Sequence, residues 1–440
     1  MYLEQQLNLS QYEKLDFFGI DVDFGDSIQT FHIGKGSAAV PGTLLGLITI
    51  HEQFGILPLK IILEPAIDLA RKGCILNKEQ AYVFKLLEPI FSHTKEGVEL
   101  FYLDGKLLSE GEKFINSDFA EFLERVSEEG AKFFYLGDGA KLVSDYFSDG
   151  GLLNENVLKE YHVAVRKPIQ TQFYGTQVFS NPAPSVGGTL IIFLLQILEK
   201  SNIKGVDFMH LLKAMQLTNN ARSEVCIDPN QEYLINNLIE EKTFSKYLKQ
   251  YGNQLKKCED GLSSERGCTT HVSVIDKNFN SASVTTTNGE GCGYILPGTG
   301  VMLNNMLGEA DLNPLGFHSW THSMRLPTMV SPSIILKDYK PYILLGSGGS
   351  NRIRSALVQV IVNVLVNEMN IDDAINAPRI HLEGNDLLHE PGVTIDNKNI
   401  LDTFTLHPFE NKNLFFGGVN AVTLHGGCSD PRRGGVCEIV

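Results

Sequence analysis

The segment T-T-H-V-S-V-I-D at residues 269–276 decides the fold class of this chain. It alternates polar and apolar residues, and a polar turn at 277–280 joins it to a second alternating run, S-A-S-V-T-T-T, at 281–287. Two such runs separated by a short turn are typical of a β-hairpin. Threonine is a good strand former, so the local pattern by itself explains Thr269 and Thr270 as the start of a strand.

Helices are predicted on both sides of this hairpin. From 58 to 73 apolar residues recur at helical spacing and stop at a glycine, and we expect that helix to pack one face inward. A second helix is expected from the turn-rich segment 181–188 to Lys200, with its apolar face in the core. Residues 342–366 predict a strand, a glycine loop and a helix in succession. Strands and helices mixed in this way predict an α+β fold.

Composition limits the classes of function. With 440 residues, 43% of them hydrophobic, the chain can form one large domain or two of ordinary size. The 37 basic and 52 acidic residues give a net charge of −15 without a basic stripe, so we expect no nucleic-acid partner. The seven cysteines include no C-x-x-C pair, which indicates mostly reduced thiols. We expect no metal and no cofactor.

Two segments bear on localisation and processing. The N-terminus has no basic region followed by an apolar one, and the longest apolar stretch, 190–198, is far shorter than the ~20 residues of a membrane span. We therefore expect a soluble chain without a membrane span, cytoplasmic on the sequence as given. Residues 226–267 are polar, and we expect them to be exposed and suited to chain cleavage.

The end of this polar stretch carries the first candidate for chemistry. Cleavage between Cys268 and Thr269 would place a hydroxyl and a new α-amino group on one residue. A hydroxyl nucleophile needs an adjacent base. A free α-amine has a pKa of about 7.7–8.0, so near neutral pH it can accept the hydroxyl proton without a histidine.

The second candidate is the glycine loop at 348–350, between the predicted strand and helix. Its unhindered N–H groups could bind a phosphate or form an oxyanion hole, and the alternative is a tight turn beneath a helix. The phosphate-loop pattern G-x-x-x-x-G-K-[ST] is absent, which argues against nucleotide binding. G-x-S-x-G is also absent, which argues against an α/β-hydrolase serine enzyme. His318 and His322 lack the glutamate of a zinc motif and are expected to have a surface or packing role.

Taken together, these segments resemble the gamma-glutamyltransferase family from about Phe31 to the last residue. The most specific match is the T-T-H-x-S-V-x-D signature at 269–276, which opens the family's small subunit. Further matching blocks follow the family order: V-P-G-T-L-L-G-L at 40–47, N-P-A-P-S-V-G-G at 181–188, T-T-T-N-G-E-G at 285–291, P-G-T-G-V-M-L-N-N-M at 297–306, M-V-S-P at 329–332, G-S-G-G-S-N-R at 346–352 and A-P-R at 377–379.

The resemblance implies a four-layer αββα sandwich of the N-terminal-nucleophile hydrolase type. It implies one precursor that cuts itself between Cys268 and Thr269, with residues 1–268 as a large subunit, N-terminally shortened relative to the family, and 269–440 as a small subunit in one intertwined domain. The substrates would be gamma-glutamyl amides such as glutathione, with water or an amine as acceptor.

The resemblance also implies roles for single residues. Thr269 would be the nucleophile, Thr287 would hold its free amine, and the backbone amides of Gly349 and Ser350 would form the oxyanion hole. Three further positions would bind the substrate: Glu309 its α-amino group, and Thr328 and Met329 its α-carboxylate, Met329 through the backbone alone.

Two departures from the family pattern leave alternatives open. The family's carboxylate-binding arginine has no counterpart in D-F-F-G-I-D-V-D-F-G-D at 16–26, and a row of aspartates would repel a carboxylate. Gly289 stands where the family has a polar contact with the substrate. The chain could therefore be an acylase of the same superfamily with a different acyl substrate, or an inactive, shortened homologue.

Overall fold

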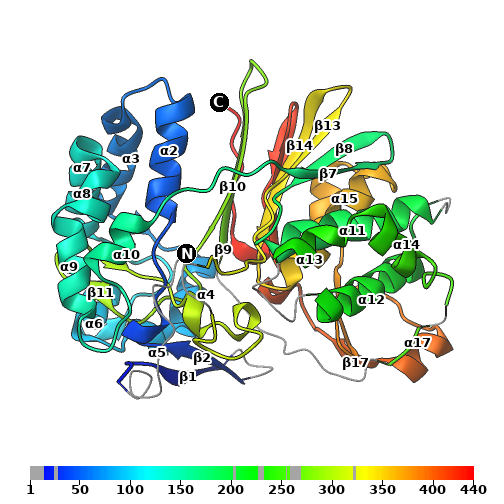
Figure 1. The fold of residues 1–440 in the computed structure, drawn as a ribbon, viewed down its shortest axis with the longest axis horizontal. Coiled ribbons are helices and arrows are strands. Elements are labelled where there is room, and N and C mark those ends of the chain that lie inside the picture. The colour runs from blue at the N-terminus through cyan, green and yellow to red at the C-terminus, as the bar shows by residue number, and fades with distance from the viewer. Residues whose placement is uncertain are drawn as a thin grey trace. The chain divides into compact units, whose positions relative to one another are not determined.

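The computed structural model describes residues 14–23, 28–201, 205–225, 232–253, 255–257, 269–320 and 324–440. The chain forms two compact units (Figure 1). Unit 1 consists of Met1–Val165 and Asn288–Leu326, and unit 2 of Arg166–Thr287 and Pro327–Val440. Each unit thus combines residues from both sides of the predicted cleavage point, while the division into two subunits stays a prediction.

Unit 1 is mostly helical. Its strands are β1 (Phe18–Asp23), β2 (Ile28–Ile33), β3 (Cys74–Ile75), β4 (Tyr102–Leu103), β5 (Lys106–Leu107), β6 (Lys113–Phe114), β11 (Ile295–Leu296) and β12 (Val301–Met302). Its helices are η1 (Lys35–Ser37), α2 (Thr43–Phe54), α3 (Leu59–Lys72), α4 (Lys78–Leu86), α5 (Glu88–Phe91), α6 (Lys95–Phe101), α7 (Ser117–Glu129), α8 (Ala131–Leu136), α9 (Asp138–Phe147), α10 (Glu155–Glu160), η2 (Met306–Gly308) and η3 (Ala310–Leu312). Its main apolar core joins α7–α10 to Cys292, Leu296 and Leu303 from the later segment.

Helix α3 shows what its sequence pattern could and could not predict. It ends at Lys72, and Gly73, at φ 83°, donates its N–H to the Leu69 carbonyl as the expected C-cap. The inward face is narrower than predicted. Ile67 is buried, but Ile61, Ile62 and Leu69 are 45–60% exposed. The helix packs mainly against α7, so only the stripe around Ile67 enters the core.

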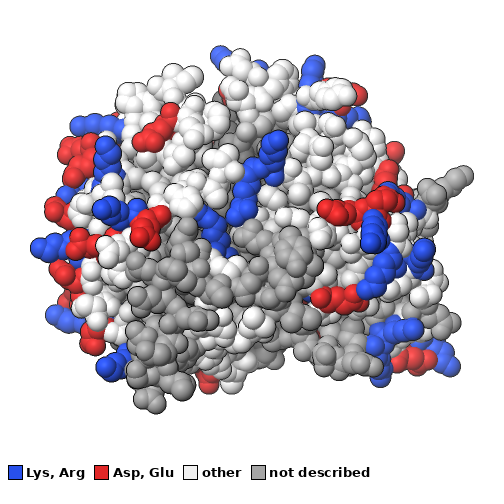
Figure 2. All heavy atoms as spheres, in the orientation of Figure 1, with Lys and Arg blue, Asp and Glu red and all other residues white. Residues whose placement is uncertain are grey.

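Charged side chains of both signs are mixed on the outer face of unit 1. Figure 2 shows lysines and arginines interspersed with acidic residues over helices α7–α9. Arg71 on α3 pairs with Glu124 on α7 at 2.8 Å, and Arg125 pairs with Asp138 at 3.1 Å. Such exposed pairs contribute on the order of 1 kcal/mol or less each to stability.

Unit 2 is built around a six-stranded sheet with the strand order β19-β18-β14-β13-β8-β7. Its strands are β7 (Ile169–Phe173), β8 (Thr176–Ser180), β9 (Thr269–Ile275), β10 (Ser281–Thr287), β13 (Ser333–Lys337), β14 (Lys340–Gly348), β15 (Ile380–Glu383), β16 (Asp386–His389), β17 (Thr405–Pro408), β18 (Gly418–Thr423) and β19 (Gly426–Cys428). Its helices are α11 (Val186–Lys200), α12 (Phe208–Val225), α13 (Glu232–Asn237), α14 (Glu241–Leu248), α15 (Arg352–Leu365), α16 (Ile371–Asn376), α17 (Lys398–Thr403), η4 (Leu414–Phe416) and η5 (Pro431–Arg433).

Three layers stack within unit 2. Helices α11 and α15 cover one face of the six-stranded sheet, and the β9–β10 hairpin packs on its other face against β14 and β18 (Figure 1). Helix α11 is buried along nearly its whole length, as its apolar sequence predicts. The mixed helix and sheet class is thereby confirmed. The fourth layer of the predicted sandwich stays a prediction.

Most predicted elements of unit 2 lie where the sequence placed them. The hairpin, the strand before the glycine loop and the helix after it are confirmed as β9–β10, β14 and α15. The prediction for the polar stretch 226–267 was incomplete, because helices α13 and α14 form there and bury Phe244 and Tyr247. Apolar residues do recur there at helical spacing, as Ile235, Leu238 and Ile239 and as Phe244, Tyr247 and Leu248, so the sequence carried a signal for these helices. In the described part of the chain, no helix is both long and apolar enough to cross a membrane.

Two glycines of β14 allow the hairpin to approach the sheet. A Cβ on Gly346 would overlap the ring of His271, and one on Gly348 would overlap the carbonyl of Thr269. These glycines are two residues apart and therefore point to the same side of β14. Any side chain there would hold β9 away from the sheet.

We expect Gly346→Ala to destabilise unit 2 by about 1–3 kcal/mol, because the added methyl group overpacks a site that the His271 ring already fills. Urea unfolding of the variant and the wild type measures the difference. Gly252→Ala is the matched control, since a Cβ at Gly252 would meet no atom within 4 Å. Equal stability of the Gly346 variant and the control would contradict the close approach.

Candidate functional site

The inner face of the hairpin is rich in hydroxyl groups. On β9, Thr269 and Ser273 are half-buried and His271 is buried, whereas Thr270 and Val272 are exposed. This alternation turns Thr269 toward the six-stranded sheet. Thr287, the last residue of β10, pairs with Thr269 across the antiparallel ladder. Directly opposed residues of such a ladder project to the same face, so the two threonine side chains share the inner face at the open end of the hairpin.

His271 fixes the hairpin to the sheet. Its Nδ1 lies 2.7 Å from Thr285 Oγ1 and its Nε2 lies 2.7 Å from Ser273 Oγ. Asn420 of β18 donates its side-chain N–H to the His271 carbonyl at 3.2 Å. Burial lowers the pKa of this imidazole to about 4, so the ring is neutral near pH 7. His271 is thus an uncharged side chain whose hydrogen bonds hold strand β9, which carries Thr269, in place.

The predicted glycine loop at residues 348–350 forms a turn, the glycine turn, beside the open end of this hairpin. Strand β14 ends at Gly348, directly against the Thr269 carbonyl, and α15 begins four residues later. Gly349 has φ 121° and Ser350 has φ 47°, both in the left-handed region. The carbonyls of these two residues accept the N–H groups of Arg352 and Ile353 at the start of the helix, at 3.0 and 3.1 Å. The predicted strand, turn and helix are therefore present, with the turn beside Thr269.

The environment of this turn favours negative charge. Helix α15 has 14 residues, and its N-terminus carries a partial positive charge that stabilises an anion placed nearby. Ser347, just before the turn, accepts the N–H of Gly418 at 3.1 Å and donates to the Gly348 carbonyl at 2.9 Å. The end of β14 is thereby tied to β18, which limits movement of the turn.

A buried network of charges holds Phe416 and Val419, which flank the Gly417–Gly418 segment next to the turn. Arg379 pairs with Asp430 at 2.6 Å, and Arg432 pairs with Glu390 at 2.5 Å and with Asp430 at 3.1 Å. Burial by itself raises the pKa of Asp430, but the charges of Arg379 and Arg432 hold that pKa below its usual range. The carboxylate is therefore ionised, and removing one member would leave a buried charge without its partner.

Sequence reasoning missed this network. The A-P-R block enters only as a family match, and the P-R-R segment at 431–433 forms the short helix η5. Several arginines in a glycine-rich, otherwise apolar region were a usable signal, because such residues are rarely buried without acidic partners. Asp430 lies 51 residues from Arg379 and Glu390 lies 42 residues from Arg432, so the sequence could not pair them, whereas Arg432 and Asp430 are two residues apart.

Thr328 and Met329, the predicted carboxylate-binding residues, lie at the N-terminus of α11. The Thr328 carbonyl accepts the N–H of Val186 at 2.9 Å, and the Thr328 hydroxyl accepts the N–H of Val330 at 3.2 Å. Met329 is buried and its side chain belongs to the core of unit 2, so only its backbone is suited to contact a ligand. The structure thus joins the M-V-S-P block to the block at 181–188, which lie far apart in sequence.

Glu309 belongs to unit 1. A Cβ on Gly289, at φ 60°, would overlap the carboxylate of Glu309 and the side-chain oxygen of Asn305. The absence of a side chain at Gly289 therefore makes room for both groups. Gly289 follows Thr287 by two residues along the chain. Cys268 and His322 lie outside the described residues, and His318 is buried with its Nε2 2.9 Å from the Gly36 carbonyl.

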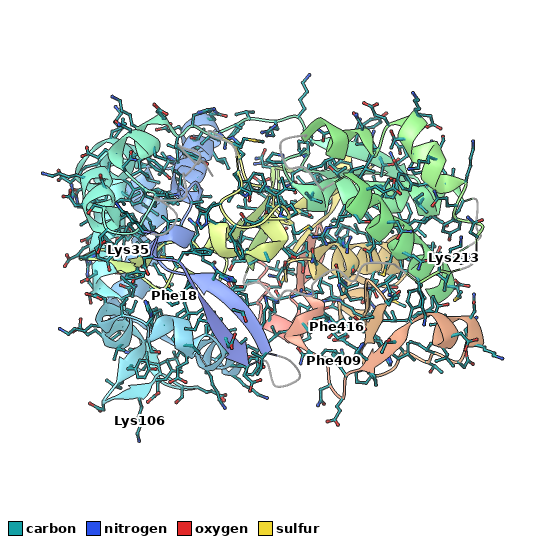
Figure 3. All side chains as sticks on the ribbon, turned by 60° about the horizontal axis from the view of Figure 1, so that its bottom comes forward. Phe18, Lys35, Lys106, Lys213, Phe409 and Phe416 are labelled. Atoms are coloured by element: carbon teal, nitrogen blue, oxygen red, sulfur yellow. The ribbon has the colours of Figure 1, made fainter. Side chains whose placement is uncertain are left out.

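Two aspartates in the described part of the acidic segment, Asp16 and Asp21, make local contacts. Asp16 accepts the backbone N–H of Lys35 at 3.0 Å, and Asp21 accepts the Thr30 hydroxyl at 2.5 Å. Phe18 packs against His93 with ring centroids 5.0 Å apart, and Lys35 lies 4.7 Å from the ring of Tyr146. Figure 3 labels Phe18 and Lys35 in this part of unit 1. The segment is thus aromatic as well as acidic.

A sequence profile described as Gamma-glutamyltranspeptidase matches residues 13–440, nearly the whole chain. The chain belongs to this family. It is accordingly an enzyme of the hydrolase class, and the family assignment made from the ordered sequence blocks is confirmed.

Relatives within the family carry different names. The chain is 29% identical over 411 residues to the "Glutathione hydrolase proenzyme" of Escherichia coli (strain K12), covering 85% of this chain and 69% of that protein. It is 30% identical over 405 residues to the "Acylase ACY 1 proenzyme" of Pseudomonas sp. (strain V22), covering 89% of this chain and 72% of that protein.

A solved structure shares the fold. The crystal structure of a cephalosporin acylase from Bacillus halodurans superposes with a TM-score of 0.76 at 20% identity, covering 97% of this chain and 87% of that one. At this identity the likeness concerns the fold. Members of this family thus include proteins named for glutathione and proteins named as acylases.

The buried imidazole of His271 predicts a pH dependence of stability. Its folded-state pKa of about 4 lies below the ordinary value of 6.5, so the unfolded chain binds more protons between these values. The neutral His271 ring contributes at most about 3 kcal/mol to the free energy of unfolding. This contribution is complete above pH 6.5 and is lost as the pH falls toward 4.

Unfolding free energies measured by urea titration from pH 7.5 to 4.5 should therefore fall less steeply for His271→Gln than for the wild type. His381, also buried with a pKa lowered to about 4, contributes a similar slope that remains in both proteins. Parallel curves for the variant and the wild type would contradict a neutral, buried His271.

Proposed function

We propose that this protein is a precursor that cuts itself before Thr269, and that Thr269 then cleaves gamma-glutamyl amides such as glutathione. The acyl group passes to water or to an amine. The observation that carries this proposal is the position of Thr269, opposite Thr287 on the inner face of the hairpin and with its carbonyl against Gly348. The family membership and the proenzyme names of the relatives support it.

The chemistry follows from the groups at this end of the hairpin. In the processed enzyme the Thr269 hydroxyl attacks the amide carbonyl of the substrate, and the free α-amine of Thr269 takes the hydroxyl proton. Thr287 is suited to hold that amine, because it is the ladder partner of Thr269. The same proton is then given to the departing amine of the substrate, which leaves an ester on Thr269. Attack by water or an acceptor amine breaks the ester and restores the hydroxyl.

The turn after β14 provides for the negative charge of the intermediate. The N–H groups of Gly349 and Ser350 would donate to the oxyanion, next to the positive end of α15. Losing one such donor typically costs on the order of 3 kcal/mol of transition-state stabilisation. Residues at the turn are therefore expected to affect kcat more than KM.

The family pattern assigns the recognition of the gamma-glutamyl group to three residues. Glu309 would bind the α-amino group of the substrate, as its family position implies. Thr328 and the backbone of Met329 would bind the α-carboxylate near the N-terminus of α11. A carboxylate such as that of Glu309 is the natural partner of an ammonium group.

Intact-mass analysis of the purified wild type and of Thr269→Ala tests the nucleophile and the processing together. We expect two chains for the wild type, the shorter beginning at Thr269, and one uncut chain for the variant. Thr270→Ala is the control, because Thr270 is exposed on the opposite face of β9, and it should be cut like the wild type. A wild type that stays a single chain under all conditions would reject the proposal and favour an inactive homologue.

A second candidate function is an acylase with a different acyl substrate. It is favoured by Phe17 and Phe18, which occupy the segment where the family has its carboxylate-binding arginine and which pack against His32 and His93. A relative of this chain is named as an acylase.

Hydrolysis rates for a panel of amides decide between the two functions. We expect the processed enzyme to prefer gamma-glutamyl 4-nitroanilide over acetyl, butyryl and phenylacetyl 4-nitroanilides by at least roughly 10-fold in kcat/KM, because one charge-assisted contact supplies that much discrimination. Preference for one of the uncharged acyl groups would establish the acylase alternative instead.

A further inference from the structure

The side chain of Arg433 lies against β18 and extends toward the glycine turn. Its aliphatic part lies flat on Gly418, where a Cβ would come within 3.0 Å of the Arg433 Cβ and within 2.8 Å of its Cγ. Gly418 pairs with Gly348 in the sheet. Arg433 therefore crosses β18 in the direction of the last residue of β14.

The guanidinium group of Arg433 reaches the residues next to the nucleophile. Its Nη1 is 3.3 Å from the point that a Cβ on Gly348 would occupy, and the Thr269 carbonyl lies against that same point. Its Nη2 is 3.2 Å from the corresponding point of Gly349. The guanidinium thus lies beside both the turn and the backbone of Thr269, all within unit 2.

Three arginines bind the backbone of η4, the segment that precedes Gly417 and Gly418. Successive carbonyls of η4 each accept an arginine N–H: Leu414 from Arg433 Nη2 at 3.2 Å, Phe415 from Arg352 Nε at 3.2 Å, and Phe416 from Arg379 Nη1 at 3.1 Å. Figure 3 labels Phe416 together with Phe409, whose ring centroid lies 5.0 Å away. Next along the chain, Gly417 touches the turn, because a Cβ on Gly349 would come within 3.1 Å of its Cα.

The backbone that carries Arg433 is also fixed. Asp430 caps η5 by accepting the N–H of Arg432 at 3.0 Å, and it accepts the N–H of Val419 on β18 at 2.8 Å. Both bonds belong to the buried network described above. Arg433 is therefore presented at the turn from a rigid support, which is the condition for selective binding.

We propose that Arg433 is a specificity-determining residue that binds a carboxylate on the acyl part of the substrate. This inference rests on the proposed function of Thr269. A guanidinium binds a carboxylate through two parallel N–H donors, and the described residues 16–23 offer no arginine for this purpose. Arg433 supplies the missing cation from the C-terminal segment. The enzyme then selects acyl groups that carry a carboxylate, the gamma-glutamyl group among them.

The test compares three anilides on the processed enzyme: gamma-glutamyl and glutaryl 4-nitroanilide, which carry a carboxylate, and butyryl 4-nitroanilide, which does not. We expect Arg433→Gln to raise KM for the two carboxylates at least roughly 10-fold while leaving kcat/KM for the butyryl compound within about twofold. Arg433→Lys should recover part of the loss, since it keeps the charge without the planar fork.

The control for removing an arginine is Arg125→Gln. Arg125 is a partly exposed residue of α7 in unit 1 that pairs with Glu129, and its loss should leave all three substrates unaffected. Intact mass shows separately whether each variant is cut before Thr269. An equal loss on all three anilides would show that Arg433 only positions the turn and would overturn the inference, as would unchanged kinetics. An uncut wild type would reject the proposed function instead. A cut wild type without preference for the carboxylates would reject only the role of Arg433.

Discussion

The close packing of β9 against β14 is the contact on which the candidate site depends. It exists because two glycines on one side of β14 leave room for the His271 ring and for the Thr269 carbonyl. The imidazole enters this space neutral and bonded to two hydroxyl groups, so it adds no charge to the interior. Every group of the proposed catalytic centre in unit 2 is placed relative to this contact, since Thr269 is the first residue of β9 and the glycine turn ends β14.

Hydroxyl groups of the hairpin and buried charged groups of the C-terminal segment have fixed partners. A row of hydroxyl groups on the inner face of the hairpin would be costly to bury without partners, and His271 and the backbone of the sheet provide them. In the buried charge network, Arg379 is neutralised by Asp430 and Arg432 by Glu390. Breaking such a buried network typically costs about 3–5 kcal/mol. These ion pairs therefore define one arrangement of the C-terminal segment.

The two proposals give different roles to the hairpin and to the C-terminal segment. In the proposed function the hairpin would supply the nucleophile and its base, and the turn with α15 would supply the environment for the oxyanion. Arg433 would act from the C-terminal segment and select the acyl group by charge. A change at this one residue would then alter the acyl preference without touching Thr269, and relatives of this chain are named both for glutathione and as acylases.

The sequence by itself determined the family, the hairpin at 269–287, the buried helix α11 and the succession of strand, glycine turn and helix around residue 348. These features follow from local patterns: alternation over a few residues, an unbroken apolar run, and glycines at positive φ. Only the tertiary structure showed the partners of these features. The sequence could not pair Arg432 with Glu390, assign Gly346 to the ring of His271, or place Arg433 beside Thr269. Such contacts join residues tens to more than a hundred positions apart, and no local pattern encodes which distant side chain fills a given space. For the same reason, three apolar residues of α3 remained exposed. Helix α14 is a different case, because Phe244, Tyr247 and Leu248 recur at helical spacing within the polar stretch.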